Sequence, residues 1–297
     1  MAVVTDSTAY LPKELADLHG IEVVPVQVVI AGHSYLEGVE ISPSEVAEAL
    51  HEYKPVSTSR PTPAEFVAAY RAAAERGASA VVSAHLSSSL SGTYESALLA
   101  SRDAEIPVTV LDTRTIAMGL GYACIAAAEA ADAGESADRV AEIAMARAES
   151  SRLYFYVDTL EYLRRGGRIG SAAALLGNAL RIKPLLHLQD GQVAPLEKAR
   201  TANRALGRLA DLSSEAIDLA EQTWGSGITT DVAVQHLEAP ERAEALAATL
   251  EERHPGVRAL VAEAGAVVAA HVGPGMVSVV IAPQVSPEQL SQTPVPQ

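Results

Sequence analysis

Short apolar runs alternate with amphipathic stretches through the first half of the chain. Apolar and β-branched residues at 2–5, 80–82 and 108–111 are each followed by a polar loop and then by helix-favouring residues. Strands that alternate with helices at this spacing predict an α/β fold with a mostly parallel sheet and helices on both faces. Pro25, within the β-branched run 21–30, predicts a strand that is broken or lies near an edge.

Polar loops at the ends of these predicted strands carry an unusual number of hydroxyl groups. They are Thr5-Asp6-Ser7-Thr8, Ser57-Thr58-Ser59-Arg60-Pro61-Thr62-Pro63 and Ser87-Ser88-Ser89-Leu90-Ser91-Gly92-Thr93. Ligands usually bind outside the carboxyl ends of parallel strands, and hydroxyls beside the free N–H groups of a helix start suit a small anion. The alternative is that these Ser and Thr side chains only cap helices. Three loops of one chemistry nevertheless indicate one shared pocket.

The pattern changes near residues 149–152, where a strand at 153–157 carries three of the few aromatic residues. We therefore expect an N-terminal α/β domain at 1–150 and a second α/β domain at 151–283. A hairpin is predicted at Asp190-Gly191. Residues 284–297 are rich in Pro, Gln and Ser, which predicts a mobile tail.

Composition narrows the classes of partner. The 297 residues are 48% hydrophobic, enough for a substantial core, and 22 Lys and Arg against 37 Asp and Glu give a net charge of −15. Such a charge disfavours nucleic acid or an anionic membrane as the main partner. The single cysteine, Cys124, lies among apolar residues and is interpreted as a core residue. No leader precedes the first strand, so a cytoplasmic location is expected.

Other kinds of site find little support. The eight histidines never occur as HxH or HExxH, no phosphate-binding GxxxxGK loop is present, and Gly119-Leu120-Gly121 is interpreted as close packing. We therefore expect neither a metal nor a cofactor. The uncharged run 264–283 is interrupted by Gly273, Pro274 and Gly275 and is interpreted as a strand with a second strand or a helix around a turn. A serine hydrolase with Ser91 as nucleophile and His271 as base stays open as an alternative, as does a small-molecule phosphotransferase.

Basic residues are concentrated in one segment. Nine Lys or Arg lie between Arg164 and Arg208, against only Asp190 and Glu197. This segment is either a docking surface for a phosphorylated ligand or an acidic partner protein, or an ordinary set of solvated helix and strand faces.

Seven stretches, in order, resemble the DegV family of bacterial fatty-acid-binding proteins, from about residue 3 to residue 281. They are Thr5-Asp6-Ser7-Thr8, Thr58-Ser59-Arg60-Pro61-Thr62-Pro63, Ser87-Ser88-Ser89-Leu90-Ser91-Gly92-Thr93-Tyr94, Leu160-Glu161-Tyr162-Leu163-Arg164-Arg165-Gly166-Gly167-Arg168-Ile169-Gly170, Ile182-Lys183-Pro184, Arg200-Thr201 and His271-Val272-Gly273-Pro274-Gly275. Arg60 departs from the family pattern, in which Gln is common at this position.

The resemblance implies a two-domain protein that holds one long-chain fatty acid in a tunnel at the domain interface. It further implies a carrier without a nucleophile of its own, which presents the carboxylate to a separate ATP-dependent fatty acid kinase for acyl-phosphate formation. We expect this carrier to be a monomer, although the sequence does not fix the oligomeric state. The hydroxyls of Thr58 and Ser91 would grip the carboxylate, with Ser59, Gly92, Thr93 and His271 around it. Arg168 and Arg200 would contact the kinase or the phosphate.

Overall fold

The computed structural model describes residues 1–292, with the side chains of 176–181 outside the description. The chain forms two compact units, and each is built from separate segments. Unit 1 comprises Met1–Gln27, Ser59–Ser150 and the segment that begins at Val285; unit 2 comprises Val28–Thr58 and Ser151–Gln284. This division differs from the continuous ranges 1–150 and 151–283 expected from the sequence, because residues 28–58 pack with the second unit.

Unit 1 holds four strands and most of the early helices. Its elements are β1 (Ala2–Asp6), the 3₁₀ turn η1 (Ser7–Ala9), α1 (Lys13–Leu18), β2 (Ile21–Val24), α3 (Pro63–Glu75), β6 (Val81–His85), α4 (Thr93–Ala100), the 3₁₀ turn η2 (Ser101–Asp103), β7 (Val108–Asp112), α5 (Met118–Asp132), α6 (Ala137–Ser150) and α11 (Pro287–Gln292).

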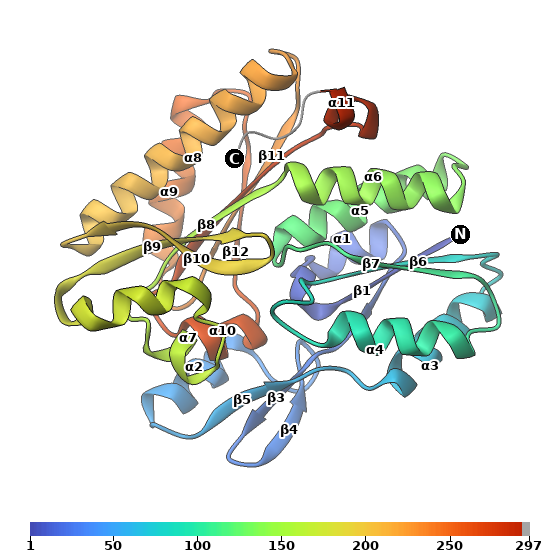
Figure 1. Cartoon of the computed structure of the whole chain (residues 1–297), viewed down its shortest axis with the longest axis horizontal. Coiled ribbons are helices and arrows are strands. Elements are labelled where there is room, and N and C mark those ends of the chain that lie inside the picture. The colour runs from blue at the N-terminus through green and yellow to red at the C-terminus, as the bar shows by residue number, and fades with distance from the viewer. Residues whose placement is uncertain (293–297) are drawn as a thin grey trace. The chain divides into compact units, whose positions relative to one another are not determined.

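The sheet of unit 1 has the strand order β2-β1-β6-β7, and every pair in it is parallel, as the sequence predicted (Figure 1). Neighbouring residues on β1 face opposite sides of it. Val3 packs in a core with residues of α5 and α6, whereas Val4 packs in a core with residues of α3 and α4. Helices therefore cover both faces. Pro25 ends β2 at the edge of this sheet, as predicted.

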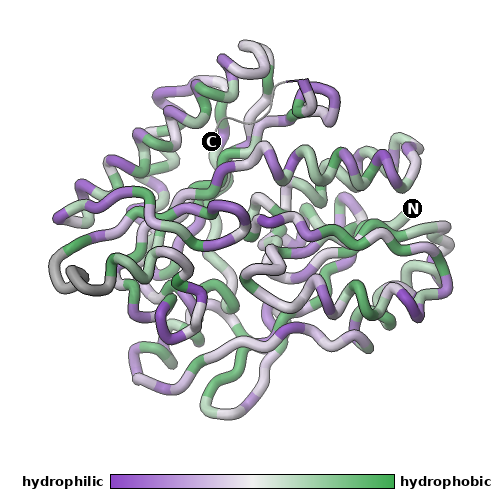
Figure 2. The backbone as a smooth tube through the Cα atoms, in the orientation of Figure 1, coloured by the Kyte–Doolittle hydropathy of each residue, from purple (hydrophilic) through white to green (hydrophobic). Residues whose placement is uncertain are grey.

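Helix α6 was not predicted from the sequence. Charged residues interrupt its apolar pattern, and its buried face is made largely of small side chains, including Ala141, Ala144 and Ala148. Figure 2 shows this alternation along α6, in contrast to the mainly hydrophobic strands of the sheet beside it. Gly121 in α5 allows close packing, as expected, because a Cβ there would crowd the carbonyl of Ala9.

Unit 2 holds the remaining elements. They are β3 (Gln27–Ile30), β4 (His33–Leu36), α2 (Pro43–His51), β5 (Val56–Ser59), β8 (Arg152–Tyr156), α7 (Glu161–Arg165), the 3₁₀ helix η3 (Gly170–Arg181), β9 (Lys183–Gln189), β10 (Gln192–Ala199), α8 (Ala202–Trp224), β11 (Thr230–His236), α9 (Pro240–Arg253), β12 (Ala259–Glu263), α10 (Ala266–Val272) and β13 (Val277–Pro283).

The larger sheet of unit 2 has the order β10-β9-β8-β13-β11-β12, and its pairs are antiparallel except β11 with β12. Alternate residues of its strands, such as Val232 and Val234, form a core with α8 and α9. The predicted hairpin joins β9 to β10, and both Asp190 and Gly191 have positive φ, as a tight hairpin turn requires. A smaller sheet has the order β4-β3-β5.

Two sequence interpretations concern the C-terminal part. The run 264–283 folds as helix α10, a turn and strand β13, in agreement with a helix and a strand around a turn. Within residues 1–292, no helix has the length and apolar character needed to span a membrane. Of the expected tail, residues 293–297 lie outside the described residues, whereas Pro287–Gln292 forms α11, whose Glu288 pairs with Arg139 of α6 at 2.6 Å.

The thiol of Cys124 gives a test of the unit 1 core. Cys124 is fully buried on α5, and burial raises its pKa to about 12. Because only the thiolate reacts, we expect labelling by iodoacetamide at pH 8 to be slower in the native protein than in denaturant by several orders of magnitude. Mass spectrometry measures the label, with Cys124→Ala as the blank. Rapid labelling under native conditions would contradict the buried position.

Candidate functional site

Unit 2 joins two residues that the sequence analysis selected. Thr58, on β5, and His271, on α10, lie 2.9 Å apart from Oγ1 to Nε2. Burial, with a further contribution from the positive charge of Arg168, lowers the pKa of His271 to about 4. The imidazole is therefore neutral at neutral pH, and its bond to Thr58 is a bond between uncharged groups.

The second ring nitrogen of His271 indicates which tautomer is present. Nδ1 is buried and has no hydrogen-bond partner among the described residues. An orphaned N–H group is rarer in proteins than an orphaned acceptor, which favours the tautomer with its proton on Nε2. In that tautomer the imidazole donates to Thr58 Oγ1, and the hydroxyl proton of Thr58 is left to donate elsewhere.

Two glycines of the matched motifs leave space for the side chains at and near His271. A Cβ at Gly166, which follows α7, would overlap the imidazole of His271, and a Cβ at Gly273 would overlap the ring of Tyr162. Gly273 also has a φ of 74°, a conformation that favours glycine. Only backbones without side chains allow this close approach, so Gly166 leaves room for the imidazole of His271 and Gly273 leaves room for the ring of Tyr162.

In unit 1, two hydroxyl side chains of the predicted site lie together. Ser91 Oγ and Thr93 Oγ1 lie 2.9 Å apart at the start of α4, and Thr93 is fully buried. Gly92 occupies the N-cap position of α4 and provides no side-chain cap. The guanidinium of Arg60 lies against Gly92, where Nη1 donates to the Gly92 carbonyl at 3.4 Å. Arg60 therefore places a positive charge beside the Ser91 loop.

The capping alternative holds for one hydroxyl loop and fails for another. Thr62 starts α3 in a capping box, in which its N–H and its hydroxyl both donate to Glu65. Ser91 and Thr93 instead bond to each other. Capping therefore accounts for Thr62 and does not account for Ser91.

The structure also gives the positions and exposure of the remaining predicted site residues. Ser59 is exposed at the end of β5. Arg168 is partly buried, donates to the Gly166 carbonyl at 2.7 Å and contributes its charge to the environment of His271. Arg200 is exposed and directly precedes Thr201, the N-cap of α8.

Ion pairs separate the basic segment into two classes. Arg164 and Arg165 both pair with Glu161, and Arg208 pairs with Glu197 and Glu215. Lys183 pairs with Asp158 at 2.7 Å, and the side chain of Arg181 lies outside the described residues. Lys198, Arg200 and Arg204 are exposed and form no ion pair with any described residue. These three exposed side chains are compatible with the predicted docking surface.

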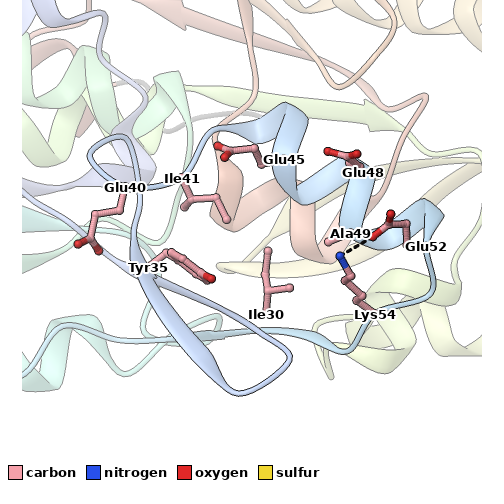
Figure 3. A pocket seen from close by; sticks show the side chains of 9 residues that line it. All are labelled: Ile30, Tyr35, Glu40, Ile41, Glu45, Glu48, Ala49, Glu52 and Lys54. Carbon is pink, nitrogen blue, oxygen red and sulfur yellow. Dashed lines mark ion pairs between the residues drawn. The ribbon is translucent and has the colours of Figure 1, made fainter.

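A pocket of about 270 Å³ in unit 2 has the wrong charge for a carboxylate (Figure 3). Four glutamates line it, against one lysine, Lys54. Three of them serve local structure, because Glu40 accepts from Leu36 N–H, Glu45 caps α2 and Glu52 pairs with Lys54. We therefore do not consider it a site for an anionic ligand.

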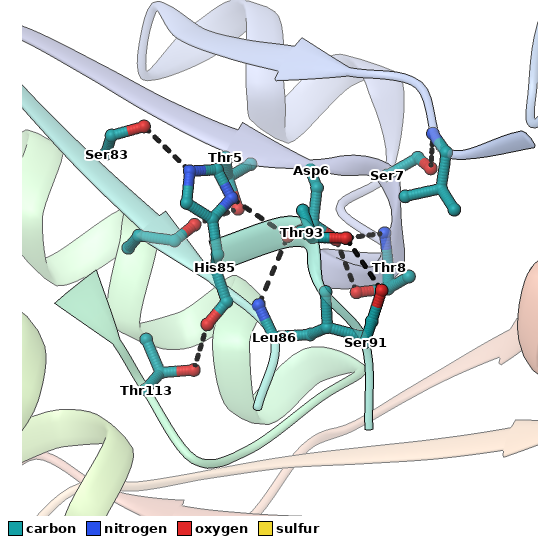
Figure 4. A network of polar contacts seen from close by, with 12 residues as sticks. Thr5, Asp6, Ser7, Thr8, Ser83, His85, Leu86, Ser91, Thr93 and Thr113 are labelled. Carbon is teal, nitrogen blue, oxygen red and sulfur yellow. Dashed lines mark hydrogen bonds and ion pairs between the residues drawn. The ribbon is translucent and has the colours of Figure 1, made fainter. Parts of the chain in front are cut away.

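Sequence reasoning missed a buried polar cluster at the ends of β1 and β6. His85 Nδ1 lies 3.0 Å from Asp6 Oδ2, and both side chains are fully buried (Figure 4). The available signal was the polar pair Ser83 and His85, two residues apart on one face of an otherwise apolar strand. Among residues 1–292, no group of three or more His, Cys, Asp or Glu is placed to hold a metal ion.

Comparison with known proteins points to one family. The family model described as "Uncharacterised protein, DegV family" matches residues 1–284. The DegV domain-containing protein SCO2569 of Streptomyces coelicolor is 50% identical over 282 residues, which cover 95% of this chain and 98% of that protein. Protein DegV of Bacillus subtilis is 34% identical over 285 residues, 94% of this chain and 98% of that protein.

Solved structures agree. A DegV family protein from Thermus thermophilus, described by its fatty acid binding, has 35% identity and a TM-score of 0.85 and covers 95% of this chain and 99% of its own. DegV from Bacillus subtilis, described as a fatty acid binding protein, has 34% identity and a TM-score of 0.85, with coverages of 95% and 98%.

The neutral His271 gives a test by pH. Its pKa is lowered from the usual 6.5 to about 4 in the folded state, so the unfolded chain takes up a proton first as the pH falls. The free energy of unfolding should therefore lose on the order of 3 kcal/mol from this group between pH 6.5 and 4. Urea unfolding of lipid-free protein measures it, and His271→Gln should show a smaller loss over the same range. Parallel pH profiles for the two proteins would contradict the assignment.

Proposed function

Because the chain belongs to the DegV family, we propose that it binds one long-chain fatty acid and presents the carboxylate to a separate ATP-dependent fatty acid kinase. The proposal rests first on the hydroxyl of Thr58, which a buried neutral imidazole orients so that its proton can be donated to an anion. Solved structures of similar proteins are described as binding fatty acids, which supports the ligand class.

In this proposal the hydroxyls of Thr58 and Ser91 donate to the carboxylate. Thr93 holds Ser91, and the N–H groups at the start of α4 are available because Gly92 provides no side-chain cap. Uncharged donors bind a carboxylate less firmly than an arginine fork does. Such a grip would leave the carboxylate oxygens open to attack a phosphoryl group.

The acyl tail then supplies most of the affinity. At roughly 0.8 kcal/mol per buried CH₂, a tail of about fifteen methylenes offers on the order of 12 kcal/mol before association costs. We expect a hydrophobic tunnel to enclose the tail. A firmly held tail and a lightly held head would let a kinase reach the carboxylate without release of the lipid.

Arg200 is the proposed contact with the kinase. Arg200 and Arg204 flank the start of α8, where the helix dipole is already positive and the first turn has no acidic residue. Positive side chains are locally unfavourable there, and an anionic partner surface or phosphate would relieve the repulsion. The chain is proposed to act as a carrier without a nucleophile of its own, in the cytoplasm, where ATP is available.

The head-group contacts can be tested by removing both hydroxyls. Each hydrogen bond to a charged carboxylate contributes roughly 1.5–3 kcal/mol, so Thr58→Ala combined with Ser91→Ala should weaken fatty acid binding by about 100-fold or more. Displacement of a fluorescent fatty acid measures the affinity. Ser57→Ala, an exposed hydroxyl of the same strand, is the matched control and should bind as wild type. Unchanged retention in the double variant would remove this site.

The role of Arg200 is tested with kinase present. Arg200→Ala should keep fatty acid affinity and lower the rate of acyl-phosphate formation at least several-fold, because the encounter loses an electrostatic contact. Arg102→Ala removes an exposed arginine of unit 1 and should leave the rate unchanged. Equal rates for Arg200→Ala and wild type would refute the docking role.

A further inference from the structure

The buried cluster of unit 1 forms a chain of hydrogen bonds that begins with Tyr70 on α3 and ends at Asp6, and Figure 4 shows its part from Ser83 through His85 to Asp6. Tyr70 donates its hydroxyl proton to Ser83 Oγ at 2.9 Å, and Ser83 Oγ lies 2.8 Å from His85 Nε2. His85 Nδ1 is in turn 3.0 Å from Asp6 Oδ2. Ser83, His85 and Asp6 are fully buried, and Tyr70 is 1% exposed.

The donors in this chain have a definite direction. Burial raises the pKa of Tyr70 to about 12, so Tyr70 keeps its proton and acts as the donor. Ser83 Oγ accepts the hydrogen bond from Tyr70 and can direct its own proton toward His85 Nε2, which leaves the imidazole proton on Nδ1, facing Asp6. The edge-to-face contact of Phe66 with the His85 ring, at 4.9 Å between centroids, holds the imidazole in this orientation.

Asp6 accepts from four donors, two on Thr8 just after β1 and two on His85 and Leu86 at the end of β6. Its Oδ1 accepts from the N–H and the hydroxyl of Thr8, at 3.1 and 2.5 Å. Its Oδ2 accepts from His85 and from the N–H of Leu86, the latter at 3.1 Å. One carboxylate therefore fixes the exit of β1 and the exit of β6 together.

The loop that carries Ser91 begins at this fixed point. Ser87 follows Leu86 directly, and its carbonyl accepts from the N–H groups of Leu90 and Ser91, at 2.9 and 3.2 Å. Ser91 then bonds to Thr93. The position of the Ser91 hydroxyl thus depends on where Asp6 holds Leu86.

Although Ser83, His85 and Asp6 have the order of bonds found in a serine hydrolase triad, their burial excludes substrate. Ser83 is fully buried, and its oxygen already accepts from Tyr70. A nucleophile needs access to a reacting carbon as well as a base. The cluster therefore serves position rather than nucleophilic attack.

We propose that Asp6, held by His85, is the positioning residue for the head-group contacts of unit 1 and so determines how strongly the protein prefers a carboxylate to an uncharged head group. This proposal rests on the proposed function. It predicts selectivity between ligands with the same tail, whereas a purely structural role would affect all such ligands alike.

Asp6→Asn tests this with two ligands of equal chain length, a fatty acid and its fatty alcohol. An amide has only one acceptor oxygen, so it must release either the Thr8 pair or the His85 and Leu86 pair. We expect fatty acid affinity to fall at least 10-fold more than alcohol affinity. An equal loss for both ligands, no loss, or tighter binding of the acid through removal of a negative charge would each overturn the proposal.

Thr8 offers a milder pair of variants should Asp6→Asn fail to fold. Thr8→Val removes the hydroxyl that donates to Asp6 with little change of shape, and Thr8→Ser retains it. Thr8→Val should lower the ratio of acid to alcohol affinity several-fold, and Thr8→Ser should restore it; equal ratios in both variants would contradict the proposal.

Ser150→Ala is the control for stability, because it removes a buried hydroxyl of unit 1 that donates to the Arg147 carbonyl on α6 and takes no part in this chain of hydrogen bonds, so it should leave the ratio unchanged. If the wild-type protein binds no fatty acid, the proposed function fails. If it binds fatty acid and the ratio does not move in the Asp6 and Thr8 variants, only the positioning role fails.

Discussion

The buried carboxylate of Asp6 constrains the path of the chain in unit 1. A charge without access to water is costly unless every lone pair is met by a donor, and Asp6 is met by four. Two of the donors are backbone N–H groups, so compensating the charge also fixes the path of the chain after β1 and after β6. The parallel sheet brings these two strand ends side by side, and Asp6 joins them.

In unit 2 the buried side chain of His271 carries no charge. His271 stays neutral because burial and Arg168 both disfavour the imidazolium. The neighbouring loops therefore offer hydroxyl and imidazole groups, which can each donate or accept, rather than fixed ion pairs. In the proposed function, such groups can adapt when the carboxylate becomes an acyl phosphate, whose charge and shape differ from those of the acid.

Much of the architecture was visible in the sequence because it depends on local pattern. The parallel sheet, the hairpin at Asp190-Gly191 and the hydroxyl loops all follow from short runs of residues. The interleaved units were not predictable, because residues 28–58 join unit 2 through contacts such as Glu37 with Val267 N–H, 230 residues apart. The bond from Thr58 to His271 was hidden for the same reason, although both residues were selected as candidates.

Side-chain chemistry alone also misplaced some roles. Thr62 and Ser91 look alike in the sequence, and only the structure separates a helix cap from a hydroxyl bonded to Thr93. Gly166 has no side chain, so the sequence does not reveal its importance. The structure shows that a Cβ at Gly166 would collide with the imidazole of His271.

The interleaving of segments has a consequence for synthesis on the ribosome. The strands of the unit 1 sheet and helices α3 to α6 are complete once Ser150 has emerged, whereas the contacts that place residues 28–58 in unit 2 are made with the segment that begins at Ser151. Domains fold as units during synthesis. Residues 28–58 therefore remain without their unit 2 contacts while unit 1 folds around them in sequence. Thr58 can meet His271 only after a further 213 residues have been made. A nascent chain therefore lacks the bond between Thr58 and His271 until those residues have been synthesised.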